Sequence, residues 1–415
     1  MLFKNKRFAI AAVIAGLGYC LIEAQGPGDL LIFLSAAGDL AAHRDIYAIK
    51  YFDGYHYYYS VLFAILLQPL WHLSFYWVKF SWLLINLALY IHLFILFAQF
   101  LSRRFNTRQS TLVLIFTFLF SLRFLHENLH ASQITILILW CCVMGLLKVF
   151  KGREFSGALL LAIGINIKLL PIVFIPYLLY RGFFRASAYT IFLYAVFLVL
   201  PAFIIGFEYN SQLLDSWFSR INPLNTQHIM DTDERSFHSI TTLLTTLLVA
   251  HPPDPLAMAL PRNIADVSLP VLSAAILVTR IVLIMFTLYF LKARSIFRSG
   301  HYNVIEISYL LLLIPLIFPH QQHYAFLFAV PAFAVVLNKL VVEYKSLSVL
   351  TVRSVTALLV FIFLCGNLKI LLGEFNRYYE HYKILTYGAL LLIPLLAWVR
   401  ADPLKAFDKG DVAAA

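Results

Sequence analysis

The chain has 415 residues, of which 61% are hydrophobic and 13% are charged. A soluble domain is roughly 45–50% apolar and about 25% charged, so most of this surface is not composed for water. Lysine and arginine total 32 against 21 acidic residues, which gives a formal net charge of +11. A nucleic-acid-binding protein would gather such an excess in a basic patch on a polar domain. The long apolar runs of this chain exclude that class.

Ten apolar runs are long enough to cross a membrane, which takes about 20 mostly apolar residues in a helix. In chain order they are 8–24, 77–101, 109–126, 132–150, 186–207, 267–291, 303–318, 322–342, 351–373 and 384–399. The stretch Phe155–Tyr180 is interrupted by Asn166, Lys168 and Pro171, and therefore predicts two short spans that meet at Lys168 and Pro171. The sequence thus predicts an all-α polytopic integral membrane protein with about 12 transmembrane helices.

Short basic loops indicate the cytoplasmic side of the membrane. Residues 4–7 include three basic side chains before the first span, which places the N-terminus inside. Every later basic loop falls on the same side only if Tyr57–Phe75 does not cross. Aromatic residues open that segment, and it contains Gln68, Pro69 and His72, so we expect a helix in the outer interface. The alternative, an ordinary span, would invert all the later basic loops.

This topology predicts a single membrane-embedded unit over residues 1–415. Residues 25–76 would form a first outer loop with interfacial helices, residues 207–266 a large outer loop, and residues 400–415 a cytoplasmic tail. Most acidic residues outside the tail and the basic loops lie in the outer loops. We therefore expect a multi-pass protein of the inner (plasma) membrane whose active site faces the periplasm or exterior. The four cysteines lie in apolar stretches without metal-ligand spacing and are expected in the core.

Three charged residues stand out by position. Asp29 follows a Gly-Pro-Gly turn at 26–28, and it could act in catalysis or simply cap the helix that follows. Lys168 lies within an apolar stretch, where a cation is costly and faces a partner or a cavity, or reaches for the interface. Arg280 lies halfway along a span, where it either pairs with a buried acid or binds an anionic ligand.

The turn Pro319–Tyr324 contains two histidines, His320 and His323. Two histidines three positions apart can form part of a metal site, but no carboxylate lies near them in the sequence. Hydrogen bonding to sugar hydroxyls is the interpretation we prefer for this turn.

Six short segments follow one another in an ordered series. They are Gly28-Asp29-Leu30, Tyr57–Leu70, Asn128 with Ser132-Gln133-Ile134, Ala162–Lys168 followed by Pro171, Phe237–Ile240, and Pro319–Tyr324. Their order and spacing, together with the topology, resemble glycosyltransferase family 87, a family of the GT-C superfamily of membrane glycosyltransferases. The Tyr-Pro-Pro start of the second segment in that family is replaced here by Tyr59 and Ser60.

The resemblance implies an inverting transfer from a polyprenyl-phosphate sugar, with an acid of the first outer loop as general base. By position this role falls to Asp29, which would take the proton of the acceptor hydroxyl. Lys168 is the first candidate to bind the donor phosphate, because the leaving phosphate needs a cation. Further phosphate-binding candidates are Arg235, Arg280 and His323. Substrate-binding candidates are Tyr58, Asn128, Gln133, Trp217, His238 and His320.

The expected function is transfer of a hexose to a lipid-linked or envelope glycan acceptor on the outer face of the membrane. Mannose is the leading candidate for the hexose. The expected partners are the donor, the acceptor and membrane lipids, with no nucleic acid. No cofactor and no metal are expected, because the first outer loop has no Asp-x-Asp pair; Asp231-Thr232-Asp233 lies in the second loop. The alternative is a lipid-glycan transporter or flippase, or a non-catalytic membrane subunit of envelope assembly. Transporters more often show related halves, which the sequence does not display.

Overall fold

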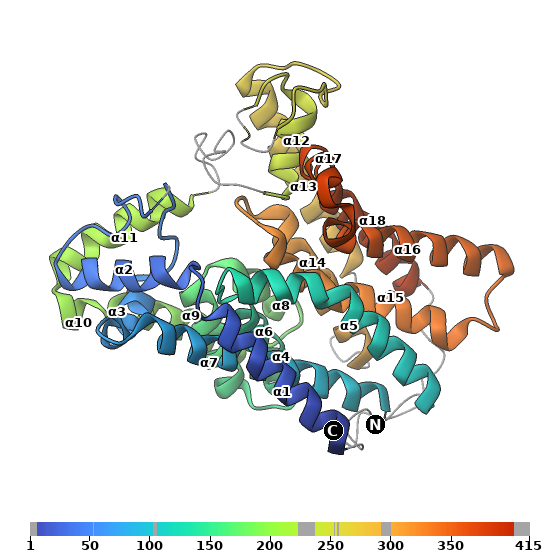
Figure 1. Ribbon diagram of the computed structural model, residues 1–415, viewed down its shortest axis with the longest axis horizontal. Helices are drawn as coiled ribbons and strands as arrows, with labels where there is room; N and C mark the ends of the chain where they lie inside the picture. The colour runs from blue at the N-terminus through green and yellow to red at the C-terminus, as the bar shows by residue number, and fades with distance from the viewer. Residues whose placement is uncertain are drawn as a thin grey trace. The chain divides into compact units, whose positions relative to one another are not determined.

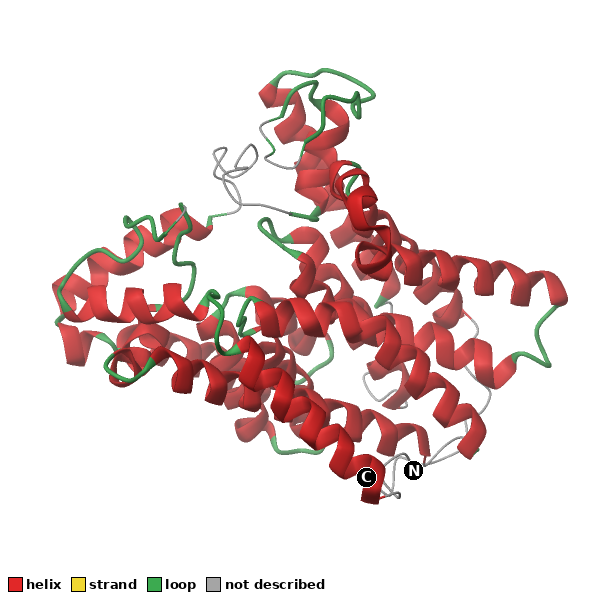
Figure 2. Ribbon diagram, in the orientation of Figure 1, coloured by secondary structure: helices red, strands yellow, loops and turns green. Residues whose placement is uncertain are grey.

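The computed structural model describes residues 6–52, 54–102, 106–222, 237–252, 254, 257–291 and 300–401. Over these ranges the secondary structure is helical, apart from an isolated bridge between Tyr51 and Tyr55 (Figure 2). The predicted all-α class is confirmed. Arg235 and the Asp231-Thr232-Asp233 triplet lie outside the described residues.

Seven helices of the described ranges are long and apolar enough to cross a membrane, so the chain is a multi-pass membrane protein. These are α4 (Phe75–Ser102), α5 (Thr107–His130), α9 (Phe184–Val199) continued by α10 (Ala202–Ile205), α13 (Leu269–Phe290), η4 (His323–Ala329) continued by α15 (Val330–Glu343), α16 (Val349–Leu372) and α18 (Ile384–Ala401) (Figure 1). Each coincides with a predicted apolar run. The other three runs form α1 (Lys6–Glu23), α6 (Thr135–Phe150) and α14 (Gly300–Ile317). The total of about twelve spans stays a prediction.

The chain divides into two compact units. The first unit comprises Met1–Gln99 and His126–Asn222, and the second unit comprises Phe100–Leu125 and Pro223–Ala415. Helix α5 therefore contributes most of its length to the second unit and its last residues to the first. The expectation of one catalytic unit over the whole chain stays a prediction.

In the first unit, α2 (Leu30–Ala41) packs beside α3 (Val61–Trp71) (Figure 1). Helix α3 has 11 residues, and at 1.5 Å per residue it extends about 16 Å, well short of a bilayer core of about 30 Å. This length favours the interfacial interpretation of Tyr57–Phe75 over an ordinary span. The Ser60 hydroxyl caps α3 by accepting the backbone N–H of Phe63.

Helix α6 packs closely against α7 (Glu154–Ile167) through two glycines. A Cβ placed on Gly157 would lie 2.6 Å from the carbonyl oxygen of Gly145, so only the absence of a side chain allows this approach. Helix α7 then ends at Ile167, and Lys168 is extended, with φ −147° and ψ 129°. A short 3-10 turn, η2 (Leu170–Val173), and α8 (Phe174–Tyr180) follow. The predicted break at Lys168 is confirmed.

The second unit is built from α13 to α18, the first part of α5, and α12 (Ile240–Leu248). Phe120 of α5 stacks on Phe333 of α15, with ring centroids 4.1 Å apart. Helices α16 and α18 meet where Gly388 leaves room for Cys365. All four cysteines of the chain are free and buried, which confirms their expected place in the core.

Candidate active site

Asp29 stands at the N-terminal end of α2 in the first unit. Its side chain makes no capping hydrogen bond to the helix backbone. The carboxylate instead accepts a hydrogen bond from the side-chain amide of Gln133. The structure thus disfavours the capping role and joins two residues that the sequence proposed separately.

The turn before Asp29 is held against the segment that carries Gln133. The backbone N–H of Asp29 donates to the carbonyl of Ala131, at 2.8 Å. A Cβ on Gly28 would lie 2.6 Å from the Ser132 hydroxyl oxygen and 3.3 Å from the backbone of Ala131, so a larger residue here would displace Ser132. These two contacts fix the distance between Asp29 and Gln133 through the backbone.

A buried lysine of α4 holds the same turn from a second direction. The ammonium of Lys79 donates to the carbonyl oxygens of Gly26, at 3.0 Å, and Pro27, at 2.8 Å. The side chain of Lys79 has an exposed fraction of 0%. A cation in such a place is costly unless hydrogen bonds satisfy it, so Lys79 is tied to the conformation of the turn. It was not among the residues singled out from the sequence.

Gln133 is oriented on every side. Its Oε1 accepts the hydroxyl of Tyr59 at 3.0 Å. Its backbone N–H donates to the backbone carbonyl of Asn128, at 2.8 Å, and its own backbone carbonyl accepts the indole N–H of Trp82, at 3.3 Å. Gln133 is buried, with 1% of its surface exposed. Its amide is therefore a preset donor toward Asp29.

Lys168 completes this group, which we call the Asp29 cluster: Asp29, Gln133, Tyr59 and Lys168. The Lys168 ammonium lies 5.6 Å from the centroid of the Tyr59 ring, within the range of a cation–π contact. The next segment is joined as well, because the Ser60 hydroxyl donates to the side-chain carbonyl of Asn166 at 2.9 Å. The extended conformation at Lys168 thus places its side chain beside Tyr59.

The charge state of Asp29 follows from these neighbours. Burial raises the pKa of Asp29, while the positive charge of Lys168 and the hydrogen bond from Gln133 lower it, and the result is about 6. A carboxyl group with this pKa is ionised near neutral pH and is a stronger base than an ordinary aspartate. Part of the residue remains accessible, as a proton acceptor requires.

Sequence reasoning missed Tyr59 and chose its neighbour Tyr58. The sequence does contain a signal for Tyr59, because it is one of the three tyrosines that open the segment Tyr57–Phe75. Nothing in the local pattern shows which of the three faces the site. Tyr58 uses its carbonyl to accept the indole N–H of Trp217 at 3.1 Å. Trp217 is fully buried, so this contact anchors α11 (Phe207–Ile221) and leaves no open indole face for a sugar.

Asn128 is the other predicted substrate residue of the first unit. It is fully buried, and within the described part of the chain neither side-chain amide atom has a hydrogen-bond partner. Buried amides are normally satisfied. Asn128 therefore keeps hydrogen-bonding capacity that a bound hydroxyl or phosphate could use.

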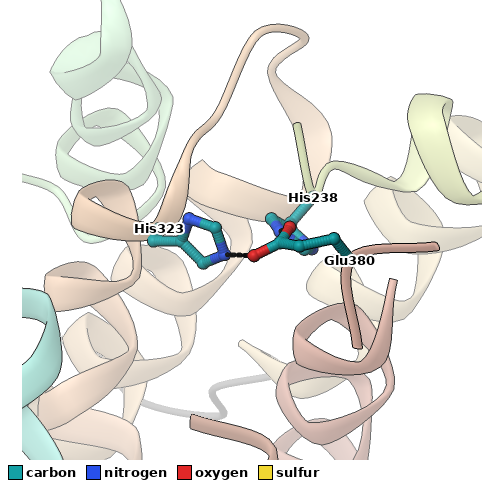
Figure 3. Close-up of side chains that lie close together, drawn as sticks. All are labelled: His238, His323 and Glu380. Atoms are coloured by element: carbon teal, nitrogen blue, oxygen red, sulfur yellow. Dashed lines mark hydrogen bonds and ion pairs between the residues drawn. The ribbon is translucent and has the colours of Figure 1, made fainter. Parts of the chain in front are cut away.

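The remaining predicted residues belong to the second unit. His238 and His323 lie against the carboxylate of Glu380 (Figure 3), at 3.1 Å and 3.0 Å. The sequence has no carboxylate close to His323 along the chain, but the fold brings Glu380 next to it from a distant segment. Burial lowers the pKa of His238, and the neighbouring Glu380 opposes this effect only in part.

Arg280 and His320 make other contacts in the second unit. The guanidinium of Arg280 donates to the hydroxyl of Thr241, at 3.1 Å. The ring of His320 lies 4.9 Å from that of Phe237, centroid to centroid. Its backbone has a positive φ of 57°, a conformation that a non-glycine residue adopts mainly in tight turns. Both side chains are thus partly engaged within the protein.

Fold and site together define a multi-pass helical membrane protein with a basic carboxylate held beside a lysine. The chain belongs to glycosyltransferase family 87, whose family model matches residues 57–319, more than half of its length. It is a membrane glycosyltransferase and acts on a sugar donor and an acceptor. The match includes Tyr59, Gln133 and Lys168, while Asp29 precedes it. Comparisons with curated proteins and with solved structures gave no match.

Proposed function

We propose that this glycosyltransferase moves a hexose from a polyprenyl-phosphate donor to a lipid-linked or envelope glycan acceptor. Mannose is the leading candidate for the hexose. The observation that carries the proposal is the Asp29 cluster. It combines a carboxylate of raised pKa with a lysine in one unit of a family 87 protein. These are the two charges that a single displacement at an anomeric carbon needs.

Asp29 acts as the general base. Its carboxylate takes the proton of the acceptor hydroxyl as that oxygen forms a bond to the anomeric carbon. The bond from the anomeric carbon to the phosphate oxygen breaks at the same time, and the phosphate departs with the electron pair. One displacement inverts the configuration of the anomeric carbon. Gln133 holds the carboxylate during this step through its amide hydrogen bond.

Lys168 binds the phosphate of the donor. The leaving phosphate is already an anion, so its departure depends on a nearby cation more than on a proton donor. The family match covers Lys168 and the contact with Tyr59 orients its side chain. Arg280 and His323 remain further candidates from the resemblance, and Arg235 lies outside the described residues. No cofactor enters these steps.

The reaction is proposed for the outer face of the inner membrane. The support is the distribution of charge along the sequence, because the basic residues concentrate in short loops and Asp29 lies in a loop of the opposite side. The substrates are accordingly a lipid-borne donor and an acceptor that is exposed to the periplasm or exterior.

A donor screen tests the proposal. The purified full-length protein is incubated with defined polyprenyl-phosphate hexoses and with nucleotide sugars, and the products are identified by mass spectrometry. We expect transfer from a polyprenyl-phosphate sugar, and we expect polyprenyl-phosphate mannose to be the best donor. Lys168→Met should weaken donor binding by about tenfold or more, because a charge-assisted phosphate contact is lost, while Lys151→Met in a basic loop should not. Transfer from nucleotide sugars alone would contradict the donor assignment.

A further inference from the structure

His238, His323 and Glu380 come from three separate segments of the second unit and meet at one point. His238 lies two residues before α12, His323 opens η4, and Glu380 belongs to α17 (Asn376–His381). The exposed fractions of the three residues are 0%, 3% and 3%. The mechanism proposed above assigns no step to this cluster as a whole.

The side chains present their ligating atoms to one another (Figure 3). The Nε2 of His238 lies 3.1 Å from one carboxylate oxygen of Glu380, and the Nε2 of His323 lies 3.0 Å from the other. One ligating atom from each residue can be chosen so that all three lie within 4.8 Å of one another. Zinc ligands at about 2.0–2.1 Å in tetrahedral geometry are about 3.3 Å apart, so the ligating atoms that are farther apart would move closer together around an ion.

The chemical type of the ligating atoms decides which metal ion fits. Two imidazoles and one carboxylate form a ligand set of zinc enzymes. Magnesium and calcium prefer oxygen ligands and would leave the two histidines unused. The imidazole nitrogens of buried histidines favour a transition ion of the zinc class.

Arg123 of α5 is the cation that competes for the same carboxylate. Its guanidinium lies 4.0 Å from Glu380, at the limit of an ion pair. Stronger contacts direct it elsewhere, since it donates to the Tyr379 hydroxyl at 2.8 Å and to the Gly366 carbonyl at 3.1 Å. The acceptors of these two hydrogen bonds lie outside the three ligating residues.

We infer that His238, His323 and Glu380 bind a zinc-class divalent ion that fixes three segments of the second unit. Three protein ligands leave a fourth position for water. The ion would tie the segment before α12, the start of η4 and α17 together, beyond the hydrogen bond of His238 and the close approach of His323 to the same carboxylate. The steps proposed above for Asp29 and Lys168 do not require this ion.

Metal analysis of the full-length protein tests the inference. The protein is purified in detergent without chelator and its metal content is measured by mass spectrometry. About one zinc per chain is expected. Removal by a chelator should lower the thermal unfolding midpoint, and zinc, but not magnesium, should restore it. Metal content at the buffer background, with no shift on adding zinc, would overturn the inference.

Variants distinguish an ion site from a purely hydrogen-bonded cluster. Glu380→Gln keeps an acceptor for the histidines but removes the anionic ligand, so zinc content should fall by about tenfold or more. His323→Ala should do the same, and His238→Asn is the second variant if that protein fails to fold. The matched control is His320→Asn, a histidine of the same turn at a positive φ that asparagine tolerates. Equal zinc content in Glu380→Gln and the wild type would refute the assignment.

Discussion

The basicity of Asp29 results from opposing influences on one carboxyl group. Burial raises its pKa, and Lys168 and Gln133 lower it, with a resulting value of about 6. An unperturbed aspartate has a pKa of about 3.9 and is a weaker proton acceptor. Lys168 and Gln133 keep the carboxyl group ionised near neutral pH, while burial raises its affinity for a proton above that of an ordinary aspartate. Under the proposed mechanism, these contacts affect the rate of transfer as well as the structure.

The pH dependence of kcat/KM follows from this value. Below a pH of about 6 Asp29 becomes protonated and can no longer accept a proton, so kcat/KM should fall about tenfold per pH unit. The profile is measured with the purified enzyme and a defined donor between about pH 5 and pH 8. Asp45→Asn is the control, since Asp45 accepts from Ser216 outside the Asp29 cluster. A profile that stays level below pH 6 would contradict the role of Asp29.

Single residues show which members of the Asp29 cluster the sequence indicates and which it does not. Asp29, Gln133 and Lys168 were predicted, because a turn, a polar motif and a break in an apolar run are local patterns. Tyr59 was missed, because its contact with Gln133 joins residues 74 positions apart. Glu380 was missed for the same reason, and its contact with His238 spans 142 positions. The periodicity of apolar residues does not show which residues far apart in the sequence come into contact.

At the scale of elements, hydropathy predicted the helices well. Each predicted apolar run forms a helix, since a bilayer requires the backbone to satisfy its own hydrogen bonds. The break after Ile167 was predictable, because Pro171 cannot donate a helical hydrogen bond. Which helices pack together was not, because apolar faces in a membrane do not identify their partners.

Helix α4 should control the reactivity of Asp29 through Lys79. Lys79→Met keeps the length of the side chain but removes the two hydrogen bonds to the carbonyls of Gly26 and Pro27. We expect kcat to fall about tenfold while KM for the donor stays near the wild-type value, because the turn loses its fixed position. Lys79→Arg should recover part of the rate. A donor KM that rises in step with the loss of kcat would contradict a positioning role.

Close packing of α6 on α7 gives a second prediction at this scale. Gly157→Ala would place a Cβ 2.6 Å from the Gly145 carbonyl and from a methyl of Val149. The helices must then move apart, and the cost should be about 1–3 kcal/mol, read as a lower thermal unfolding midpoint. Gly18→Ala is the matched control, because nothing lies within 4 Å of its added Cβ. Equal midpoints for both variants would contradict the packing argument.

At the scale of the whole molecule, the distribution of the net charge of +11 predicts how the chain is oriented in the membrane. Basic residues gather in short loops, which the positive-inside rule assigns to the cytoplasm. Few charges remain outside these loops, and the candidates for the chemistry lie in the proposed outer loops or at a break in an apolar stretch. The composition that excludes a soluble protein thus also narrows the search for the active site.

Cysteine labelling tests this orientation. The four native cysteines are buried and should react little with a membrane-impermeant maleimide. Gln25→Cys, at an exposed position of the predicted first outer loop, should be labelled in intact cells. Lys151→Cys, also exposed, should react only after the membrane is permeabilised. The reverse pattern would place Asp29 on the cytoplasmic side and contradict the proposed direction of transfer.

The most direct test of the central claim is the turnover of Asp29→Asn. Asparagine keeps the size of the side chain and can still bond to Gln133, but it cannot accept the proton of the acceptor hydroxyl. Donor binding and single-turnover transfer are measured on the same purified protein. We predict donor affinity close to that of the wild type and a rate lower by about 10²–10⁴-fold. Transfer at the wild-type rate would show that Asp29 is not the base.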